Sequence, residues 1–405
     1  MIKSFKTVKL NQRISCDLQF HEDINIVTGK NGSGKTTLLK LLWYAISGNL
    51  ERIMPEIGFN SFEIVTDELM VRMAIESRQK RRIVKLQYRV GDVEKEFVRP
   101  VERSMEWEWD DLQEANRAIV RVSGASIFFP TFRRIEGGFS IATHPDEDIE
   151  RFMRRRVFRP SREALVSRES RDLQQAINNL SERLSVGSHR FVASISTDDI
   201  VRLLMSKYAE ISERTNRLHM DLSRFILQRV GGEITPDSGT AGTMDETESK
   251  EALADIQQRA RNVVQESEAL LRPFTVLSDL IAKIFQYKGI KLADPITLGE
   301  AREAIASEVL SSGEKQMLSF LCYNAFANQA CLFIDEPEIS LHVDWQRILF
   351  PVLLQQSAGN QFIVATHSPF IYSKYSDKEL MLSQDRGSDD ADTEDDRIRN
   401  HYLSR

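Results

Sequence analysis

Near its N-terminus the chain reads Gly29-Lys30-Asn31-Gly32-Ser33-Gly34-Lys35-Thr36. An apolar, β-branched run, Ile24–Thr28, precedes this stretch, and a run with helical composition, Thr37–Trp43, follows it. A strand, a glycine-rich loop and a helix in this order form a phosphate cradle, because the loop N–H groups converge and the helix N-terminus adds its positive dipole end. A loop rich in glycine and lysine alone is usually an ordinary turn. The full GxxxxGK[ST] pattern in this context predicts binding of a nucleoside triphosphate.

The residues expected to contact the nucleotide belong to this loop and to the first helical turn after it. Lys35 would reach the β- and γ-phosphates, and the Thr36 hydroxyl would be a ligand of Mg²⁺. ATP and Mg²⁺ are therefore the expected cofactors. The residues predicted to bind them here are Gly29, Asn31, Gly32, Ser33, Gly34, Lys35, Thr36 and Thr37.

Length and composition indicate a soluble protein with more than one structural unit. The chain has 405 residues, of which 28% are charged and 41% apolar, and its net charge is −6. Its cysteines, Cys16, Cys322 and Cys331, are odd in number and form no CxxC pair, which favours the reducing cytosol over a disulfide framework or a zinc site. The N-terminus, Met1–Val8, alternates like a strand and lacks the apolar segment of a signal peptide. Because no apolar run has membrane-spanning length, we expect a cytoplasmic protein without membrane contact.

The first 150 residues show the period-two alternation of half-exposed strands. Residues 2–10 and 14–20 predict an opening β-hairpin, and Gly48 is placed to end the helix that follows the phosphate loop. Further antiparallel strands are expected at Phe62–Val65, Val71–Ile75 and Ile83–Val90.

The middle of the chain has helical periodicity, with apolar positions in steps of three and four. Gly231 to about Lys250, rich in small and polar residues, separates two such runs and predicts a flexible tip. We expect an antiparallel helical hairpin, with a kink or joint at Pro273; a compact helical subdomain is the alternative. The periodic positions are Ile200, Leu204, Tyr208, Ile211, Thr215, Leu218, Leu222 and Phe225, and then Leu253, Ile256, Ala260, Val263, Ser267, Leu270, Phe274, Leu277, Ile281 and Ile284.

Three charged stretches allow both a functional and a solvated interpretation. Arg133 and Arg134 follow the strand Ala125–Phe129, where they either meet a phosphate or form a solvated corner. The arginine-rich stretch from Arg151 to Arg171 is either a solvated face or a site for nucleic acid or an acidic phage protein. The acidic run from Asp385 to Asp396 is expected to be a solvated tail rather than a metal site.

A second constellation lies near the C-terminus. The apolar run Leu332–Ile334 ends in Asp335 and Glu336, so Asp335 would hold Mg²⁺ opposite Thr36, and Glu336 would deprotonate the attacking water. The sequence LSSGEKQ starts at Leu310, PEISLH starts at Pro337, and ATHSP starts at Ala365.

These elements, in this order, resemble the ABC-type ATPases: LSSGE resembles the signature motif, DEPEISLH the Walker B motif with the D-loop, and THSP the switch histidine. The helical insertion is similar to that of the SMC, RecF and OLD branch. The residues DEPE…LH, from Asp335 to His342, and THSPF, from Thr366 to Phe370, are most similar to those of OLD-like, AAA-annotated ATPases of bacterial anti-phage systems. The resemblance covers about 1–145 and 300–384. Two departures are that the glutamine loop of transporters cannot be placed and that Val343 stands where relatives often carry proline.

The resemblance implies a mixed α/β fold with a P-loop head, a homodimer or higher oligomer, and composite ATP sites. In such a dimer Ser311, Ser312, Gly313 and Glu314 of one subunit would contact the nucleotide of the other, and Glu336 and His367 would be catalytic. The simpler alternatives are a plain helix N-cap for Ser311 and Gly313 and a satisfied buried histidine for His367. The expected domains are a head formed by 1–148 and 300–384, an inserted helical subdomain over 149–299, and a tail over 385–405.

Two functions from different classes follow from the resemblance. The first is a regulatory ATPase that senses phage infection and controls a separately encoded effector, which is expected to be a nuclease. PARIS, Septu and retron-associated ATPases show this arrangement. The second is an ATPase of DNA repair or DNA tethering, similar to RecF and SMC, without a toxin partner. An importer subunit is disfavoured by the long helical insertion. The nuclease domain of OLD proteins has no counterpart in the residues after 384.

Overall fold

The computed structural model describes residues 1–78, 81–100, 110–131, 134–135, 177, 179–230, 246–284, 310–356 and 358–382. The chain divides into two compact units. The first comprises Met1–Ser196, Leu310–Phe320 and Ala327–Arg405, and the second comprises Thr197–Val309 and Leu321–Phe326. The arginine-rich stretch, most of the predicted hairpin tip and the acidic tail lie outside the described residues.

The first unit begins with an antiparallel sheet in the strand order β2-β1-β4-β5-β6-β7. The predicted opening hairpin is confirmed, because β1 pairs with β2 in antiparallel register. The three strands expected from the alternation are present as β4, β5 and β6, and the sequence analysis missed β7. The bounds are β1 Ile2–Leu10, β2 Ile14–Gln19, β4 Ser61–Thr66, β5 Leu69–Arg78, β6 Arg81–Val90 and β7 Val93–Pro100.

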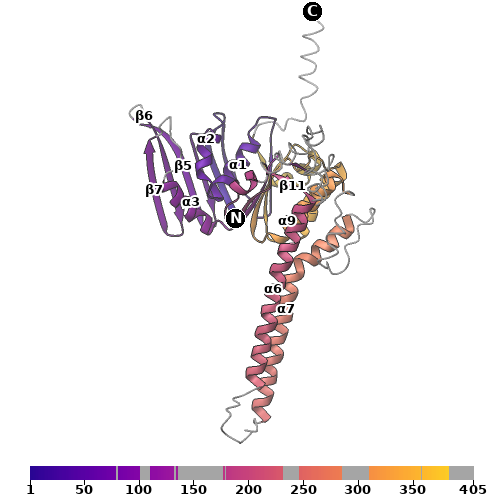
Figure 1. The fold of residues 1–405 in the computed structure, drawn as a ribbon. Helices are drawn as coiled ribbons and strands as arrows, with labels where there is room; N and C mark the ends of the chain where they lie inside the picture. Colours follow the sequence, from indigo (N-terminus) through magenta and orange to yellow (C-terminus); the bar gives the residue numbers. More distant parts are fainter. Residues whose placement is uncertain are drawn as a thin grey trace, which may run out of the picture. The chain divides into compact units, whose positions relative to one another are not determined.

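One face of this sheet is buried and the other faces solvent, which explains the alternation. In β4, for example, Phe62 and Ile64 are buried. Helix α3 (Asp110–Val122) lies beside the end of the sheet formed by β5 and β7 (Figure 1). It is tied to β7 by ion pairs that join Lys95 to Glu114 and Arg99 to Asp111.

A second, parallel sheet carries the phosphate loop, in the order β10-β8-β12-β13-β3-β14. The central strands are buried along their whole length, as expected for strands covered on both faces. Helix α1 (Lys35–Ile46) packs into one hydrophobic core with both sheets. The strand bounds are β3 Ile24–Thr28, β8 Ala125–Phe129, β10 His189–Phe191, β12 Ala330–Asp335, β13 Gln361–Ala365 and β14 Glu379–Met381.

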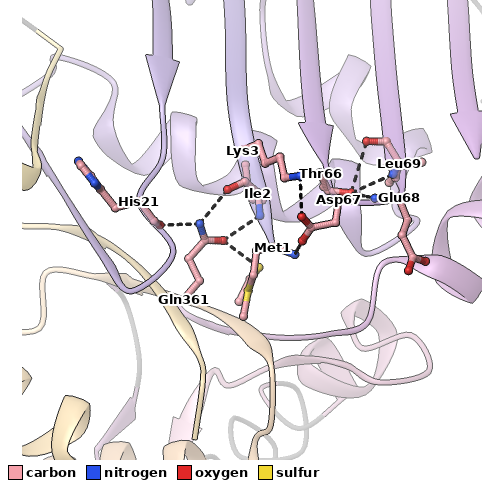
Figure 2. Close-up of polar contacts among 10 residues, drawn as sticks. Met1, Ile2, Lys3, His21, Thr66, Asp67, Glu68, Leu69 and Gln361 are labelled. Carbon is pink, nitrogen blue, oxygen red and sulfur yellow. Dashed lines mark hydrogen bonds and ion pairs between the residues drawn. The ribbon is translucent and has the colours of Figure 1, made fainter. Parts of the chain in front are cut away.

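The two sheets are joined through the buried side chain of Gln361, at the start of β13 (Figure 2). Its Oε1 accepts a hydrogen bond from the Ile2 N–H at 2.8 Å, and its Nε2 donates to the Ile2 and His21 carbonyl oxygens, also at 2.8 Å. The same region contains an ion pair between Asp67 and Lys3 at 2.9 Å. A single amide of the parallel sheet thus hydrogen-bonds both backbone groups of Ile2 in the antiparallel sheet and the His21 carbonyl oxygen between β2 and β3.

The remaining elements of the first unit are short or flank the parallel sheet. Gly48 has a positive φ of 66°, and a Cβ there would lie 2.9 Å from the Asn116 carbonyl oxygen, so glycine is required where α1 ends. Arg134 lies in a two-stranded sheet, whereas Arg133 is outside the described residues. The bounds are α2 Leu50–Glu56, β9 Arg134–Ile135, β11 Ser194–Ile195, α10 Val343–Gln355, α11 Pro369–Tyr372 and η2 Ser373–Lys378.

The second unit is dominated by two long helices, α6 (Thr197–Val230) and α7 (Glu246–Ile284), which lie side by side (Figure 1). The rings of Tyr208 and Phe274 meet edge to face, with centroids 5.9 Å apart. Ion pairs join Arg214 to Glu266 and Arg229 to Asp255 across the pair. Residues later in α6 therefore contact residues earlier in α7. The two helices run antiparallel, which confirms the predicted antiparallel hairpin.

The periodic positions predicted from Ile200 to Phe225 and from Leu253 to Ile281 are the less exposed ones in both helices, with one exception. Leu253 is 56% exposed, and Ala252 takes the buried place beside it. Pro273 lies inside α7, which continues on both sides of it, so no joint between two helices occurs there; the kink expected at Pro273 stays a prediction. None of the described helices is long and apolar enough to cross a membrane.

Candidate functional site

The phosphate loop has the backbone geometry that its glycines predict. Gly29, Gly32 and Gly34 have φ values of 147°, 77° and 87°, in the region that only glycine adopts without strain. Gly34 is the N-cap of α1, and a Cβ at this position would overlap the side chain of Ile14. The loop therefore turns from β3 into the N-terminus of a helix of 12 residues, which is an anion-binding geometry.

Lys35, the first residue of α1, points back at its own loop. Its Nζ donates to the Gly29 carbonyl oxygen at 2.8 Å and to the Lys30 carbonyl oxygen at 3.2 Å. Burial lowers the pKa of Lys35, and the carboxylates of Glu336, Asp335 and Glu338 oppose this by raising it. The ammonium group therefore lies within the field of three carboxylates that come from the other end of the sequence.

Other loop residues differ in their exposure. Lys30, Asn31 and Gly32 are exposed, whereas Ser33, Gly34, Thr36 and Thr37 are half-buried. Ser33 Oγ is shielded from solvent and has no hydrogen-bond partner among the described residues. Thr37 Oγ1 accepts a hydrogen bond from Asn11 Nδ2 at 2.9 Å. A shielded hydroxyl, exposed loop backbone and a helix N-terminus are donors that fit the phosphates of a nucleotide.

The acidic pair follows β12, as the sequence predicts. β3, β13 and β12 are neighbouring parallel strands, so their carboxyl ends, and the residues that follow them, share one edge of the sheet. Asp335 is buried, and its carboxylate accepts a hydrogen bond from the Thr131 hydroxyl at the end of β8. Carboxylate and hydroxyl oxygens are the ligand types that a hard cation such as Mg²⁺ prefers, although no group of three or more His, Cys, Asp or Glu side chains with metal-ligand geometry occurs among the described residues.

Glu336 has an unusual backbone. Its φ is 49°, a left-handed conformation that costs free energy for a residue other than glycine, while its N–H donates to the Ala365 carbonyl oxygen at 2.8 Å. Strained residues of this kind cluster at functional sites. The Glu336 side chain is half-buried.

The loop after Glu336 packs against the loop that carries His367. Glu338 Oε1 accepts a hydrogen bond from the His367 N–H at 2.7 Å, and its Oε2 accepts one from the Thr366 hydroxyl at 2.9 Å. Burial and the nearby Lys35 ammonium lower the pKa of His367, while Glu338 and Asp335 act in the opposite direction. His367 therefore lies in the same electrostatic field as the P-loop lysine.

The LSSGE residues open helix α9 (Ser312–Phe326). Glu314 Oε2 accepts a hydrogen bond from the Ser311 N–H at 2.6 Å, and Ser311 Oγ accepts one from the Glu314 N–H at 3.4 Å. This is a reciprocal capping box, so the helix-cap alternative describes what Ser311 and Glu314 do within the chain. Ser311 is exposed and Ser312 half-buried, so the helix N-terminus also remains open to an anion from outside.

Gly313 serves a steric purpose in the chain. A Cβ at this position would overlap the Ser340 carbonyl oxygen, and Ser340 itself has a φ of 69°. Nearby, Gln316 Nε2 donates to the Pro337 carbonyl oxygen at 2.8 Å. The start of α9 and the loop over residues 337–342 therefore pack closely together.

Four residues of this region were missed by the sequence analysis: Thr131, Gln316, Glu338 and Gln346. Thr131 could have been found, because it follows a strand that neighbours β12 and so reaches the same sheet edge. The other three hydrogen-bond backbone atoms of loops, and Glu338 and Gln346 also bond the Thr366 and Ser368 hydroxyls; these contacts depend on loop conformations that the sequence does not predict.

Comparison with known proteins gives one family and several similar structures. Residues 3–372 match the family described as AAA ATPase domain. No curated protein matches the chain.

Among similar solved structures is the Smc head domain from Pyrococcus furiosus with an extended coiled coil, bound to the C-terminal domain of ScpA, at 13% identity and a TM-score of 0.35, covering 95% of this chain and 94% of that one. A second is the Smc head domain with a coiled coil and joint from Pyrococcus yayanosii, at 13% identity and a TM-score of 0.34, covering 95% of each chain. At these identities and scores, the family assignment rests on the match over residues 3–372 alone.

Proposed function

Because this chain belongs to the AAA ATPase domain family, we propose that it is a regulatory ATPase whose head-to-tail dimers bind ATP between subunits and control a separately encoded effector of anti-phage defence. The ATPase activity follows from the family. The dimer, the effector and the biological role are the proposal. The observation that carries it is the electrostatic coupling of Lys35 with Asp335, Glu336 and His367, which follow or end neighbouring parallel strands at one sheet edge.

The residues of the site fit ATP and Mg²⁺. Lys35 and the N–H groups at the start of α1 would hold the phosphates, and Thr36 and Asp335 would hold the metal. When bound, Mg²⁺ neutralises charge that develops on the phosphate oxygens. The carboxylate of Glu336 would accept the proton of the attacking water, and the largely neutral imidazole of His367 would offer a hydrogen bond to the γ-phosphate.

A second subunit supplies what one chain lacks in this proposal. Ser311 and Gly313 stand at the open N-terminus of α9, which can bind an anion presented by another molecule. ATP would then be held between the P-loop of one copy and α9 of the other. Hydrolysis would remove the shared γ-phosphate and separate the heads.

The site can be tested with single substitutions. Lys35→Ala should abolish ATP binding, whereas Glu336→Gln should bind ATP, hydrolyse it slowly and accumulate the dimer in light scattering. Lys40→Ala, a change of another lysine on α1, is the matched control and should retain hydrolysis. Wild-type hydrolysis by Glu336→Gln would show that Glu336 is not the general base.

The composite site can be tested by mixing two inactive variants. In a mixed dimer of Lys35→Ala and Ser311→Arg, one site carries both changes and the other carries neither. Activity should therefore reappear on mixing, up to about a quarter of the wild-type value when dimers form statistically, because half of the dimers are mixed and each has one intact site of two. No recovery over a range of mixing ratios would contradict a site shared in this way.

The regulatory role can be tested by expressing the chain alone and together with the products of the genes that neighbour its own gene. The purified chain should cleave neither DNA nor RNA and should be harmless when expressed alone. Co-expressed with a nuclease-like neighbour, it should hold that protein inactive until infection, and Glu336→Gln should abolish protection without dissolving the complex. If the chain instead binds DNA and its loss sensitises cells to DNA damage, the repair or tethering function is the better one.

A further inference from the structure

We propose that Glu338 is a positioning residue for ATP hydrolysis: its carboxylate fixes the turn at residues 366–368 and thereby sets where the His367 imidazole stands relative to the P-loop. The inference rests on the proposed site and adds a residue to it. Glu338 lies outside the acidic pair, two residues after Glu336.

Both carboxylate oxygens of Glu338 are used by the same turn. Oε1 accepts the His367 N–H at 2.7 Å, and Oε2 accepts the Thr366 hydroxyl at 2.9 Å. The Thr366 oxygen in turn accepts the Ser368 N–H at 2.9 Å. A two-oxygen acceptor that grips consecutive residues fixes the orientation of the turn as well as its distance.

A second side chain fastens the same two loops. Gln346, on α10, accepts the Ser368 hydroxyl with Oε1 at 2.6 Å and donates with Nε2 to the Leu341 carbonyl oxygen at 2.9 Å. The turn at 366–368 is therefore held to the loop at 337–342 at both ends. With Gln346 in place, removal of Glu338 should loosen His367 without unfolding the loop.

The loop at 337–342 is itself fixed to α9, through Gln316 Nε2 on the Pro337 carbonyl oxygen and through the close packing of Gly313 against Ser340. Glu338 thus connects the start of α9, which would face the partner's nucleotide, with His367, which would face the chain's own. A shift of α9 on dimer formation would be passed to His367 through this carboxylate.

Glu338 also contributes charge, so positioning must be separated from an electrostatic role. Burial lowers the pKa of His367, and the negative charge of Glu338 is among the influences that raise it. The same charge raises the pKa of Lys35. A substitution that keeps the hydrogen bonds and removes the charge distinguishes these effects.

The experiment compares Glu338→Ala with Glu338→Gln in steady-state ATP hydrolysis and in ATP binding. The alanine variant should lose on the order of 10²-fold in kcat, because His367 is no longer held in place, while the Kd for ATP changes less than about threefold. The glutamine variant should recover most of kcat: its Oε1 can accept the His367 N–H, and its Nε2 can donate to the Thr366 oxygen. Glu56→Ala is the matched control, since it removes a carboxylate that accepts the Tyr44 hydroxyl elsewhere in the same unit.

Hydrogen exchange over residues 362–372 without ATP gives a readout that does not depend on activity. Glu338→Ala should speed exchange in this segment, and Glu338→Gln and Glu56→Ala should not. Wild-type kcat in Glu338→Ala, or unchanged exchange, would overturn the proposal; a glutamine variant as inactive as the alanine variant would assign Glu338 a charge or proton role instead. A wild-type chain without ATPase activity would refute the proposed function, and the exchange data would still decide whether Glu338 fixes the turn.

Discussion

At residue 313 the requirement for glycine comes from packing within one chain, before any nucleotide binds. The Ser340 carbonyl oxygen occupies the space that a Cβ would need. We predict that Gly313→Ala destabilises the nucleotide-free protein by about 1–3 kcal/mol, as overpacking does. The measurement is urea unfolding without ATP. Gly58→Ala is the control, because Gly58 has open space around its Cα. If the two variants are equally stable, packing does not require glycine at position 313. Phosphate binding would then be the role that remains for Gly313.

A second residue-scale prediction concerns His189, which is fully buried on β10. Its Nδ1 lies 2.8 Å from Ser126 Oγ, and its Nε2 has no hydrogen-bond partner among the described residues. Burial lowers the pKa of His189 from 6.5 to about 4. The unfolded chain therefore takes up a proton below pH 6.5 that the folded chain resists, and stability falls as the pH drops from 6.5 toward 4.

This effect amounts to roughly 2 kcal/mol at pH 5. His189→Gln cannot titrate, so its stability should fall less than that of the wild type between pH 7 and pH 5. Comparison of the two pH profiles by thermal unfolding cancels the contribution of carboxylates that titrate in the same range. Parallel profiles would mean that His189 is not held neutral by the fold.

At the scale of elements, the α6–α7 pair contains one polar layer in an otherwise apolar seam. Thr215 lies one heptad after Tyr208, and Ser267 lies one heptad before Phe274, so the ring contact places the two hydroxyls opposite each other. Thr215 Oγ1 and Ser267 Oγ are both shielded from solvent and have no hydrogen-bond partner in the described part of the chain. A shielded hydroxyl without a partner weakens the pair locally.

We predict that Thr215→Val with Ser267→Ala slows hydrogen exchange in both helices and stabilises them by about 1–2 kcal/mol. Ser223→Ala is the control, since this serine is exposed and donates only to the His219 carbonyl oxygen. Faster exchange in the double variant would show that the hydroxyls have partners, such as water, that stabilise the layer.

The α6–α7 pair also shows which elements the spacing of apolar residues can predict and which it cannot. The 4-3 spacing identified the seam because each helix has only one apolar stripe, and the error at Leu253 lies near the start of α7, where the seam ends. Periodicity missed β7, whose mostly exposed residues bury no face, and β10, whose three residues are too few to show a pattern. Helix α3 was also missed, although its buried residues Leu112, Ala115 and Ile119 follow one another in steps of three and four.

At the scale of the whole molecule, the motifs predict which residues come together but not the hydrogen bonds that position them. The P-loop and the acidic pair were predictable because each follows an apolar strand, and parallel strands share one carboxyl edge. The bonds of Glu338, Gln346 and Gln316 were not, because they depend on the conformations of loops. The roles predicted for Ser311, Ser312 and Glu336 stay predictions until the variants are measured.

The junction of the two sheets also depends on a contact between residues that lie far apart in the sequence, Gln361 and Ile2. Gln361→Leu would remove the hydrogen bonds that the Gln361 amide makes to the Ile2 N–H and to the Ile2 carbonyl oxygen (Figure 2). The His21 carbonyl oxygen would keep its hydrogen bond from Asn25 Nδ2. We predict a loss of about 2–4 kcal/mol in the free energy of unfolding, measured with urea. Gln19→Leu on the exposed face of β2 should change stability by less than about 0.5 kcal/mol. A small effect of Gln361→Leu would mean that water replaces the amide at this junction.

The order of the parallel sheet has a consequence for how this protein is made. Strand β3, which leads into the P-loop, pairs only with β13 and β14 among the described strands, and both lie beyond residue 360. The P-loop therefore leaves the ribosome long before β13 and β14, the neighbours of β3, have been synthesised. During that interval the nascent chain exposes an unpaired apolar strand, which a chaperone can protect, and the nucleotide site forms only after β13 and β14 have been synthesised.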